Sequence, residues 1–377
     1  MGNEAVAQGA LAAGCDFFAG YPITPATEIL EEMARLLPPR GGVFLQMEDE
    51  LGAMAAVIGA AWGGARAMTA TSGPGFTLMQ EHIGYAAITQ TPCVVVDAQR
   101  SGPSTGQPTL PSQGDVMQAR FGTHGDRPAL ALTASSVRGA YDRTRLAFTL
   151  AERHRLPAVL LLDAVVSHMR EPVDLPPPPP PARRTFAALP SGAPRFGPRA
   201  PFVPFGVGEP TVVTGLAHGP TGATGGGSGA FTADTLRAVG EALAADPDVA
   251  AAVEAYRTED ADLLLVAFGI TARAAREAVD RLRREGTRAG LLDLGVLWPF
   301  PAAAVAQAAE RARAVVVAEL NLGQLTLAVE AAVAGRAPVY PLLRADGGLL
   351  EPEAISRFAQ GAATGEARAA KEAMAGA

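Results

Sequence analysis

Three polar side chains stand where apolar, strand-like runs of the sequence end. Thr24 follows the run at 15–19 and lies between two prolines in the stretch GYPITP. Glu50 opens a segment rich in Ala, Met, Val and Ile, and Arg100 comes directly after the run CVVVDAQ. A hydroxyl, a carboxylate and a guanidinium can together hold a small anionic substrate and accept or share a proton.

Glu50 has two interpretations. Acidic side chains are favoured in the first turn of a helix, where they interact with the helix dipole, and Glu50 begins a predicted helix. In the functional interpretation, the apolar surroundings raise the proton affinity of the carboxylate, which can then share a proton with a ring nitrogen. The sequence alone supports both.

Thr24 and Arg100 are also open to two interpretations each. Because the prolines restrict the backbone, Thr24 either caps the helix that follows or is held with its hydroxyl toward a ligand. Arg100 is either an ordinary surface arginine or a fork that binds a substrate carboxylate through two hydrogen bonds.

Three further features could contribute to binding. The turn TSGPG at 71–75 lets the backbone approach a ring or an anion closely, although Gly-Pro turns also simply end strands. The loop at 101–113 contains no Lys or Arg and is long for a compact domain, and such loops are often functional. Downstream, His124 either reads a second substrate carboxylate or is a capping or surface histidine.

These residues are positioned by apolar runs that alternate with helical patterns. The predicted strands are 16–21, 42–47, 65–71, 92–99, 127–133 and 156–163. Nearly continuous apolar strands separated by helices indicate an α/β fold with a doubly wound parallel sheet, covered by helices on both faces. In such sheets ligands collect at the carboxyl ends of the strands, where Thr24, Glu50, the 71–75 turn and Arg100 all lie.

The chain changes character after residue 172. Residues 176–181 are an unbroken run of prolines, which predicts a stiff spacer, and a Gly-rich stretch and a helical segment at 231–256 follow. Strand and helix patterns resume near residue 260 and predict a second, smaller α/β domain with flavodoxin-like or transketolase-C-like layers. The predicted divisions are a first domain at 1–172, a linker and insertion at 173–255, and a second domain at 256–377.

Composition narrows the class of protein. The net charge of −7 argues against a nucleic-acid footprint, and the two cysteines, Cys15 and Cys93, lie far apart in apolar runs. That placement argues against a disulfide scaffold and against a cysteine-ligated cluster. The N-terminus lacks the basic region of a signal peptide, and the longest apolar run is too short to span a bilayer. We expect a cytoplasmic protein without nucleic-acid or membrane partners.

Several blocks of the sequence together resemble one family. They are QGALAAGCDFFAGYPITPATEI, EDELGAMAAVIGAAWGGARAMTATSGPGFTLMQE, QRSGPSTGQPTLPSQGD and, in the second half, LWPFP and VVAELNLGQL. In this order they resemble the alpha subunits of the 2-oxoacid:ferredoxin oxidoreductases, and they look more like the 2-oxoglutarate type than the pyruvate type. These thiamine-diphosphate enzymes oxidatively decarboxylate a 2-oxoacid with CoA and pass the electrons to ferredoxin. The resemblance covers residues 1–170 and 256–345 and leaves out the segment between them.

The resemblance implies roles for the residues above. The first domain would face the aminopyrimidine of thiamine diphosphate, and the second would be the family's transketolase-C-like domain II. Glu50 matches the catalytic glutamate that hydrogen-bonds the pyrimidine N1′. Thr24 and Arg100 match the threonine and the arginine that contact the substrate and its carboxylate. The cofactor-binding wall beside the pyrimidine ring corresponds to Thr71, Ser72 and Gly73.

The resemblance also implies that this chain carries half of an active site. The chain lacks a Gly-Asp-Gly loop with an Asn-rich continuation for Mg²⁺ and diphosphate, and it lacks the cysteines for a [4Fe-4S] cluster. In the family a beta subunit supplies both, so thiamine diphosphate is expected at the alpha–beta interface, with no metal site in this chain. The other expected partners are CoA, the 2-oxoacid, ferredoxin and a gamma component that is either a separate chain or absent.

Other functions stay open on the sequence. The substrate could be pyruvate or a branched-chain 2-oxoacid, because the pocket residues come from two chains. A thiamine-dependent decarboxylase or synthase can also carry a TSGPG turn, but the LWPFP and YPITP blocks count against it. A non-catalytic scaffold subunit is an alternative from another class, and the joint presence of Glu50, Thr24 and Arg100 counts against that.

Overall fold

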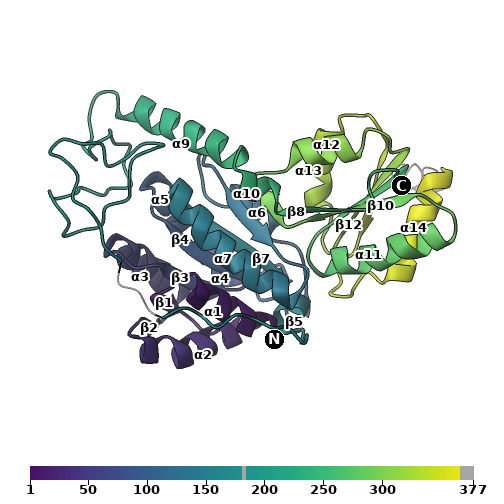
Figure 1. Ribbon diagram of the computed structural model, residues 1–377, viewed down its shortest axis with the longest axis horizontal. Helices are drawn as coiled ribbons and strands as arrows, with labels where there is room; N and C mark the ends of the chain where they lie inside the picture. The colour runs from purple at the N-terminus through teal and green to yellow at the C-terminus, as the bar shows by residue number, and fades with distance from the viewer. Residues whose placement is uncertain (181–183, 366–377) are drawn as a thin grey trace.

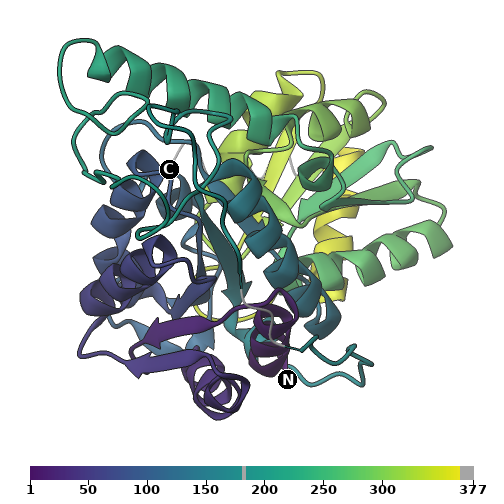
Figure 2. The same ribbon diagram turned by 60° about the vertical axis from the view of Figure 1, so that its left-hand side comes forward.

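The computed structural model describes residues 1–180 and 184–365, which form two α/β units and a long connecting segment (Figure 1). The two units lie side by side, as the turned view in Figure 2 also shows. The last proline of the predicted spacer and the end of the predicted second domain lie outside the described residues. None of the described helices is both long enough and apolar enough to cross a membrane.

The first unit alternates strands and helices. Its strands are β1 (Phe17–Gly20), β2 (Val43–Gln46), β3 (Ala67–Thr71), β4 (Cys93–Ser101), β5 (Gln107–Pro111), β6 (Leu130–Thr133) and β7 (Pro157–Asp163). Its helices are α1 (Gly2–Ala12), α2 (Thr27–Leu36), α3 (Glu50–Trp62), α4 (Gly73–Leu78), α5 (Gln80–Ile88), α6 (Val116–Phe121), α7 (Val137–His154) and α8 (Ala164–His168), with a 3-10 turn η1 (Pro38–Arg40).

The first sheet has the predicted doubly wound, parallel character. Its strand order is β11-β6-β7-β4-β3-β1-β2, and β5 pairs with the end of β4. The pairs from β6 through β2 are all parallel, whereas β5 and β11 pair antiparallel with their neighbours. The central strands β4 and β7 are buried along their whole length because helices cover both faces of the sheet. The carboxyl ends of β1, β3 and β4 therefore meet at one edge, where the candidate site lies.

The second unit is a smaller sheet of five strands in the order β13-β12-β9-β10-β8. Its strands are β8 (Val253–Tyr256), β9 (Leu263–Ala267), β10 (Ala289–Leu294), β12 (Ala314–Glu319) and β13 (Val339–Leu343). Helices α11 (Gly269–Arg284) and α14 (Pro352–Thr364) pack on one face, and α12 (Ala302–Ala308) and α13 (Gln324–Val333) pack on the other. The predicted second α/β layer structure is confirmed.

One strand from the second half of the chain completes the first sheet. β11 (Val296–Trp298), which contains the start of the LWPFP block, pairs antiparallel with β6, with Val296 opposite Leu132. One apolar cluster contains buried side chains from both sheets, such as Val95 of β4 and Val266 of β9. The two units thus share a core, and the second unit packs against the first.

The connecting segment is irregular up to α9 (Ser228–Ala244), yet it is anchored to the first unit. Aromatic rings of the segment surround Trp62, with centroids at 4.8 Å for Phe202 and 5.4 Å for Phe205. The buried Arg155 at the end of α7 donates to the carbonyls of Arg195 and Ala200. In Figure 1, α9 runs along the top of the first unit toward the second.

The helical segment predicted at 231–256 is too long. α9 ends at Ala244, a short helix α10 (Pro247–Ala250) follows, and Val253–Tyr256 forms β8 instead. β8 pairs antiparallel with β10, with Val253 opposite Leu294. The hydrogen bonds of a sheet edge override the local helical pattern, and the sequence of the segment itself does not reveal them.

Candidate active site

Glu50 is held at the start of α3, beyond the end of β2. The neighbouring Asp49 caps this helix, because its Oδ1 accepts a 2.7 Å hydrogen bond from the backbone N–H of Gly52. Glu50 is the next residue, and only 5% of it is exposed. The cap fixes the direction of the first turn, so the Glu50 carboxylate is placed by backbone hydrogen bonding and not by a flexible loop.

The Glu50 carboxylate lies against the TSGPG turn that follows β3. A Cβ atom placed on Gly75 would lie 2.2 Å from Oε1 of Glu50 and 2.1 Å from Oγ1 of Thr71. Both separations are far shorter than van der Waals contact, so this approach requires glycine at position 75. The tertiary structure thus brings together two features that are 25 residues apart in the sequence.

The turn presents polar atoms that have no partner within residues 1–180 and 184–365. Thr71 and Ser72 are fully buried, and the hydroxyls of both lack a hydrogen-bond partner among the described residues. The backbone N–H of Gly73 donates to Oδ1 of Asp97 at 3.1 Å, which fixes the start of α4. Buried hydroxyls normally find a partner, so unpaired ones beside a carboxylate mark a place where a polar ligand can bind.

Arg100 and Thr24 are in direct contact. The Nη1 of Arg100 donates a 2.8 Å hydrogen bond to the carbonyl of Thr24, and its Nη2 donates at 3.2 Å to the carbonyl of Thr105. Arg100 is buried, its Nε has no partner, and it makes no ion pair with any described residue. An arginine that is buried without a carboxylate retains free N–H donors for an anion.

The alternative that Thr24 caps a helix is wrong. α2 begins at Thr27, its N-cap is Ala26, and Ala26 makes no side-chain capping bond. Thr24 is exposed and lies in the turn before the helix, where its carbonyl accepts from Arg100. Its hydroxyl is therefore not used to start α2.

Two neighbouring acids behind the turn, the buried Asp97 and the half-buried Asp115, were not picked out by sequence reasoning. Asp97 of β4 is fully buried, and neither its Oδ2 nor the Oδ2 of Asp115 has a partner among the described residues. Burial, together with the charge of the neighbouring Asp115 carboxyl, raises the pKa of Asp97 well above its usual range. Burial also raises the pKa of Asp115. The signal that could have found the pair is the single acid inside the otherwise apolar run CVVVDAQ.

Gln99 links this acid pair to the strand that carries Arg100. Its Oε1 accepts a 3.2 Å hydrogen bond from the backbone N–H of Asp115, and its Nε2 has no partner. Gln99 is fully buried. The end of β4 thus presents an amide, a carboxyl group and a guanidinium, all with unpaired buried atoms. This concentration of unpaired polar atoms at one sheet edge defines the candidate site.

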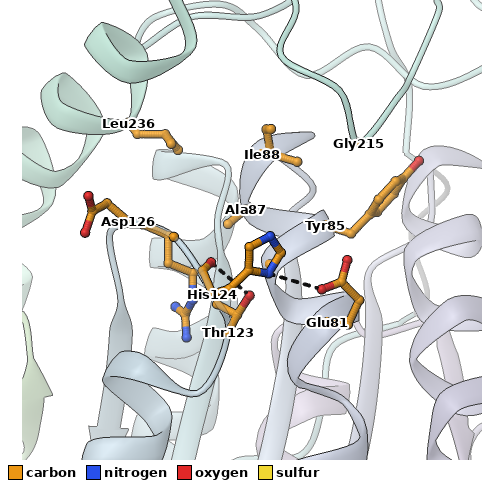
Figure 3. Close-up of a pocket in the computed structure, with 12 residues that line it drawn as sticks. Glu81, Tyr85, Ala87, Ile88, Thr123, His124, Asp126, Gly215 and Leu236 are labelled. Carbon is orange, nitrogen blue, oxygen red and sulfur yellow. Dashed lines mark hydrogen bonds and ion pairs between the residues drawn. The ribbon is translucent and has the colours of Figure 1, made fainter. Parts of the chain in front are cut away.

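His124 lies elsewhere. It comes before the amino end of β6, whereas Arg100 lies near the carboxyl end of β4. The His124 ring is exposed, 3.5 Å from the Glu81 carboxylate. Figure 3 shows both side chains in a surface pocket of about 210 Å³, with Tyr85 of α5 and Leu236 of α9 among its lining residues. The structure does not bring His124 to the residues at the strand ends.

Comparison with known proteins defines the class first. Residues 8–204 match the family "Pyruvate flavodoxin/ferredoxin oxidoreductase, thiamine diP-bdg". Residues 261–355 match "Pyruvate:ferredoxin oxidoreductase core domain II". The first unit is thus a thiamine-diphosphate-binding domain of the kind found in oxidoreductases that use 2-oxoacids.

The chain belongs to the 2-oxoacid:ferredoxin oxidoreductase family and corresponds to its alpha subunit. It is 47% identical over 368 residues to "2-oxoglutarate synthase subunit KorA" of Methanothermobacter marburgensis, covering 94% of this chain and 96% of that relative. It is 36% identical over 363 residues to "Ketoisovalerate oxidoreductase subunit VorB" of the same organism, covering 94% and 95%. The family and the enzyme class predicted from the sequence are confirmed.

Solved structures agree with this assignment. "2-oxoglutarate:ferredoxin oxidoreductase from Magnetococcus marinus with 2-oxoglutarate, coenzyme A and succinyl-CoA bound" matches with a TM-score of 0.85 and 32% identity. The match covers 95% of this chain but 64% of that chain, so this chain spans somewhat less than two thirds of its length. "Split gene transketolase, inactive beta4 tetramer" matches with a TM-score of 0.56 at 14% identity, which shows a shared fold alone.

The residues around Glu50 fit the aminopyrimidine of thiamine diphosphate. A buried carboxylate, the unpaired hydroxyls of Thr71 and Ser72 and the glycine-lined turn provide hydrogen-bonding groups and close backbone approach for a flat, nitrogen-bearing ring. Within residues 1–180 and 184–365, no cluster of three or more His, Cys, Asp or Glu side chains could hold a metal ion.

Proposed function

We propose that this chain is the alpha subunit of a 2-oxoglutarate:ferredoxin oxidoreductase. The reaction is 2-oxoglutarate plus CoA and two oxidised ferredoxins giving succinyl-CoA, CO₂, two reduced ferredoxins and a proton. The single observation that carries the proposal is the buried Glu50 carboxylate against the TSGPG turn at Gly75. That pairing is what a site needs in order to hold a pyrimidine ring and move a proton on it.

Glu50 is the catalytic group in this proposal. Its carboxylate accepts or shares a proton at a ring nitrogen of the bound cofactor, and the low-dielectric surroundings strengthen that hydrogen bond. Thr71, Ser72 and Gly73 line the ring, and the unpaired hydroxyls of Thr71 and Ser72 support this role. When bound, thiamine diphosphate supplies the nucleophilic carbon and the electron sink for decarboxylation.

Arg100 and Thr24 orient the substrate. The free N–H donors of the Arg100 guanidinium bind the 2-oxoacid carboxylate, because the fork geometry matches a carboxylate and no acid in the described part of the chain forms an ion pair with it. Thr24 accepts from Arg100 through its carbonyl, so its exposed hydroxyl is carried on the same hydrogen-bonded unit and can contact the substrate. The burial of Arg100 keeps water away from the carboxylate that it binds.

2-Oxoglutarate is the favoured substrate because of the named relatives. Four relatives called 2-oxoglutarate synthase subunits share between 42% and 47% of their residues with this chain. The ketoisovalerate oxidoreductase subunits share 36% and 37%. Pyruvate and branched-chain 2-oxoacids are the alternatives that the activity test must include.

A beta subunit completes the active site in this proposal. Four large apolar side chains near Glu50 and the turn are each at least 40% exposed, which is the kind of surface that a partner covers. They are Tyr21, Leu45, Leu51 and Leu78. The beta subunit would supply Mg²⁺, the diphosphate site and the [4Fe-4S] cluster, and ferredoxin would take up the electrons.

The two free, buried cysteines fit a reducing compartment such as the cytoplasm, where we expect the complex to act.

The test is Glu50→Gln in the complex reconstituted with its beta subunit, with Glu48→Gln as the matched control. Glu48 is exposed two residues earlier, so it changes the same charge outside the site. We expect Glu50→Gln to lower ferredoxin reduction by a factor of roughly 10² to 10⁴ with assembly intact, and Glu48→Gln to keep turnover. Normal turnover of the Glu50→Gln complex would contradict the assignment. Absence of turnover of every 2-oxoacid by the wild-type complex would favour the scaffold alternative.

A further inference from the structure

Gln113, at the end of the 101–113 loop, is bonded to the second unit through every polar atom it has. Its backbone N–H donates to the carbonyl of Leu320 at 2.9 Å, and its carbonyl accepts from Nδ2 of Asn321 at 2.7 Å. Its Oε1 accepts from the N–H of Leu320 at 3.0 Å and from Oγ1 of Thr271 at 3.1 Å. Its Nε2 donates to the carbonyl of Phe268 at 2.9 Å. Gln113 is fully buried.

The junction around Gln113 is tightly packed on both sides. Asp163 at the end of β7 accepts a 2.7 Å hydrogen bond from the N–H of Ile270 at the start of α11. A Cβ atom on Gly269 would lie 2.4 Å from Oδ2 of Asp163 and 2.7 Å from Nε2 of Gln113. Gly269 has a φ of +57°, so both the conformation and the space favour glycine. The carboxyl ends of β7, β9 and β12 thus converge on this one amide side chain.

The residues that follow Gln113 also form hydrogen bonds with the second unit. Gln324, at the start of α13, donates to the carbonyl of Gly114 and accepts from the N–H of Met117 at 2.9 Å. The loop also touches the second unit at a separate point: a Cβ atom on Gly347 would lie 2.7 Å from Cδ1 of Leu110. The C-terminal part of the loop therefore contacts the second unit at two separate points, around Gln113 and at Leu110.

The N-terminal part of the loop is held by Arg100, the candidate substrate-binding residue. Arg100 donates to the carbonyl of Thr105 in the loop and to the carbonyl of Thr24 outside it. Residues 102–110 are otherwise exposed. Within the loop, β5 pairs antiparallel with the end of β4, and beyond that pairing the loop is held by Arg100 at one end and by the second unit at the other.

We propose that Gln113 is a positioning residue through which the second unit holds the 101–113 loop over Arg100 and Thr24 and so sets the affinity for the 2-oxoacid. Only an amide can fill this role, because the side chain must accept two hydrogen bonds and donate two, to the Phe268 carbonyl and to the Asp163 carboxylate, in a buried place. The inference that the 2-oxoacid is the ligand rests on the proposed function, while the coupling between loop and second unit does not.

The test compares Gln113→Ala with Gln307→Ala, a change of the same type at an exposed residue of the second unit. In the reconstituted complex, we expect Gln113→Ala to raise the apparent KM for 2-oxoglutarate on the order of tenfold, with kcat changed less than about threefold. In the full-length chain alone, amide hydrogen exchange over 103–111 should become faster in Gln113→Ala and stay unchanged in Gln307→Ala.

Asn321→Ala provides a second variant that leaves Gln113 itself in place. It removes the donor to the Gln113 carbonyl from the other side of the junction and should raise both KM and loop exchange. The double variant should show less than the sum of the two effects, because both act on one connection. An unchanged KM with unchanged loop exchange in both variants would overturn the proposal, as would a loss of kcat alone with the loop still protected. Absence of 2-oxoacid turnover in the wild type would instead refute the proposed function, and the exchange measurement would still test the coupling.

Discussion

The Nη1 of Arg100 donates a 2.8 Å hydrogen bond to the carbonyl of Thr24, so the two residues expected to hold the substrate already form one unit in the folded chain. They come from the ends of β4 and β1 and are 76 positions apart in the sequence. Arg100 uses a second nitrogen to hold Thr105. The two main-chain carbonyls therefore fix the orientation of the guanidinium. Its remaining N–H groups are left free to donate to a substrate carboxylate.

Replacing Arg100 with lysine tests this arrangement. A lysine ammonium is a single point charge, so it cannot hold Thr24 and Thr105 and also bind a carboxylate with fork geometry. We expect Arg100→Lys to raise the KM for the 2-oxoacid by on the order of tenfold or more in the complex, measured by ferredoxin reduction. The control is Arg199→Lys at an exposed position of the connecting segment. An unchanged KM for the Arg100→Lys complex would mean that another residue holds the carboxylate.

Gly75→Ala tests the approach of the TSGPG turn to Glu50. The added methyl group would overlap Oε1 of Glu50 and Oγ1 of Thr71, so the turn or the carboxylate must move. We expect weaker binding of thiamine diphosphate to the complex, by roughly a factor of ten to a hundred, measured by calorimetric titration of the cofactor-free complex.

The matched control for Gly75→Ala is Gly59→Ala inside α3. An added Cβ at Gly59 meets no atom within 4 Å, and alanine is the better helix former. This variant should bind the cofactor normally and unfold at a slightly higher temperature. Equal cofactor affinity in the Gly75→Ala and wild-type complexes would refute the close approach of the turn to the carboxylate.

Asp293 predicts a specific pH dependence of stability. Burial raises the pKa of this carboxyl to about 6, against the opposing hydrogen bond from Ser135 and the charges of Arg276 and Arg143, while Glu254 adds to the rise. The folded state binds this proton more tightly than the unfolded state does. Protonation of Asp293 therefore stabilises the folded state, and this stabilisation is complete below the unfolded pKa near 3.8. It is lost as pH rises from there to about 6 and does not return at pH 7.

Asp293→Asn should therefore raise the free energy of unfolding at pH 7 relative to the wild type, by up to about 3 kcal/mol, and much less at pH 4. The asparagine still accepts from Ser135, so the packing is kept. Chemical denaturation of the full chain at both pH values measures this difference. Asp126→Asn, at an exposed position, should show no such change with pH. A variant effect of equal size at both pH values would show that Asp293 is not the group responsible.

The alternation of strands and helices was predictable because it is written in local patterns. Runs such as CVVV at 93–96 and AVLLL at 158–162 are apolar throughout, which is what a strand buried on both faces requires. Polar and glycine-rich segments follow these runs, and the rule that ligands collect at the carboxyl ends of parallel strands placed Thr24, Glu50 and Arg100 at one edge. The divisions at residues 172 and 255 stay a prediction, although β8 begins at Val253 and β11 completes the first sheet.

The sequence by itself determined the family, the two α/β patterns and the types of residue at the strand ends, because blocks, periodicity and turn residues are all local properties of the chain. The tertiary structure alone decided which of these residues touch. Glu50 meets Gly75, Arg100 holds Thr24, and Gln113 joins Leu320 from 207 positions away. Such contacts depend on how sheets and helices pack over the whole molecule, and the neighbours of a residue along the chain do not say which distant residue that packing brings against it.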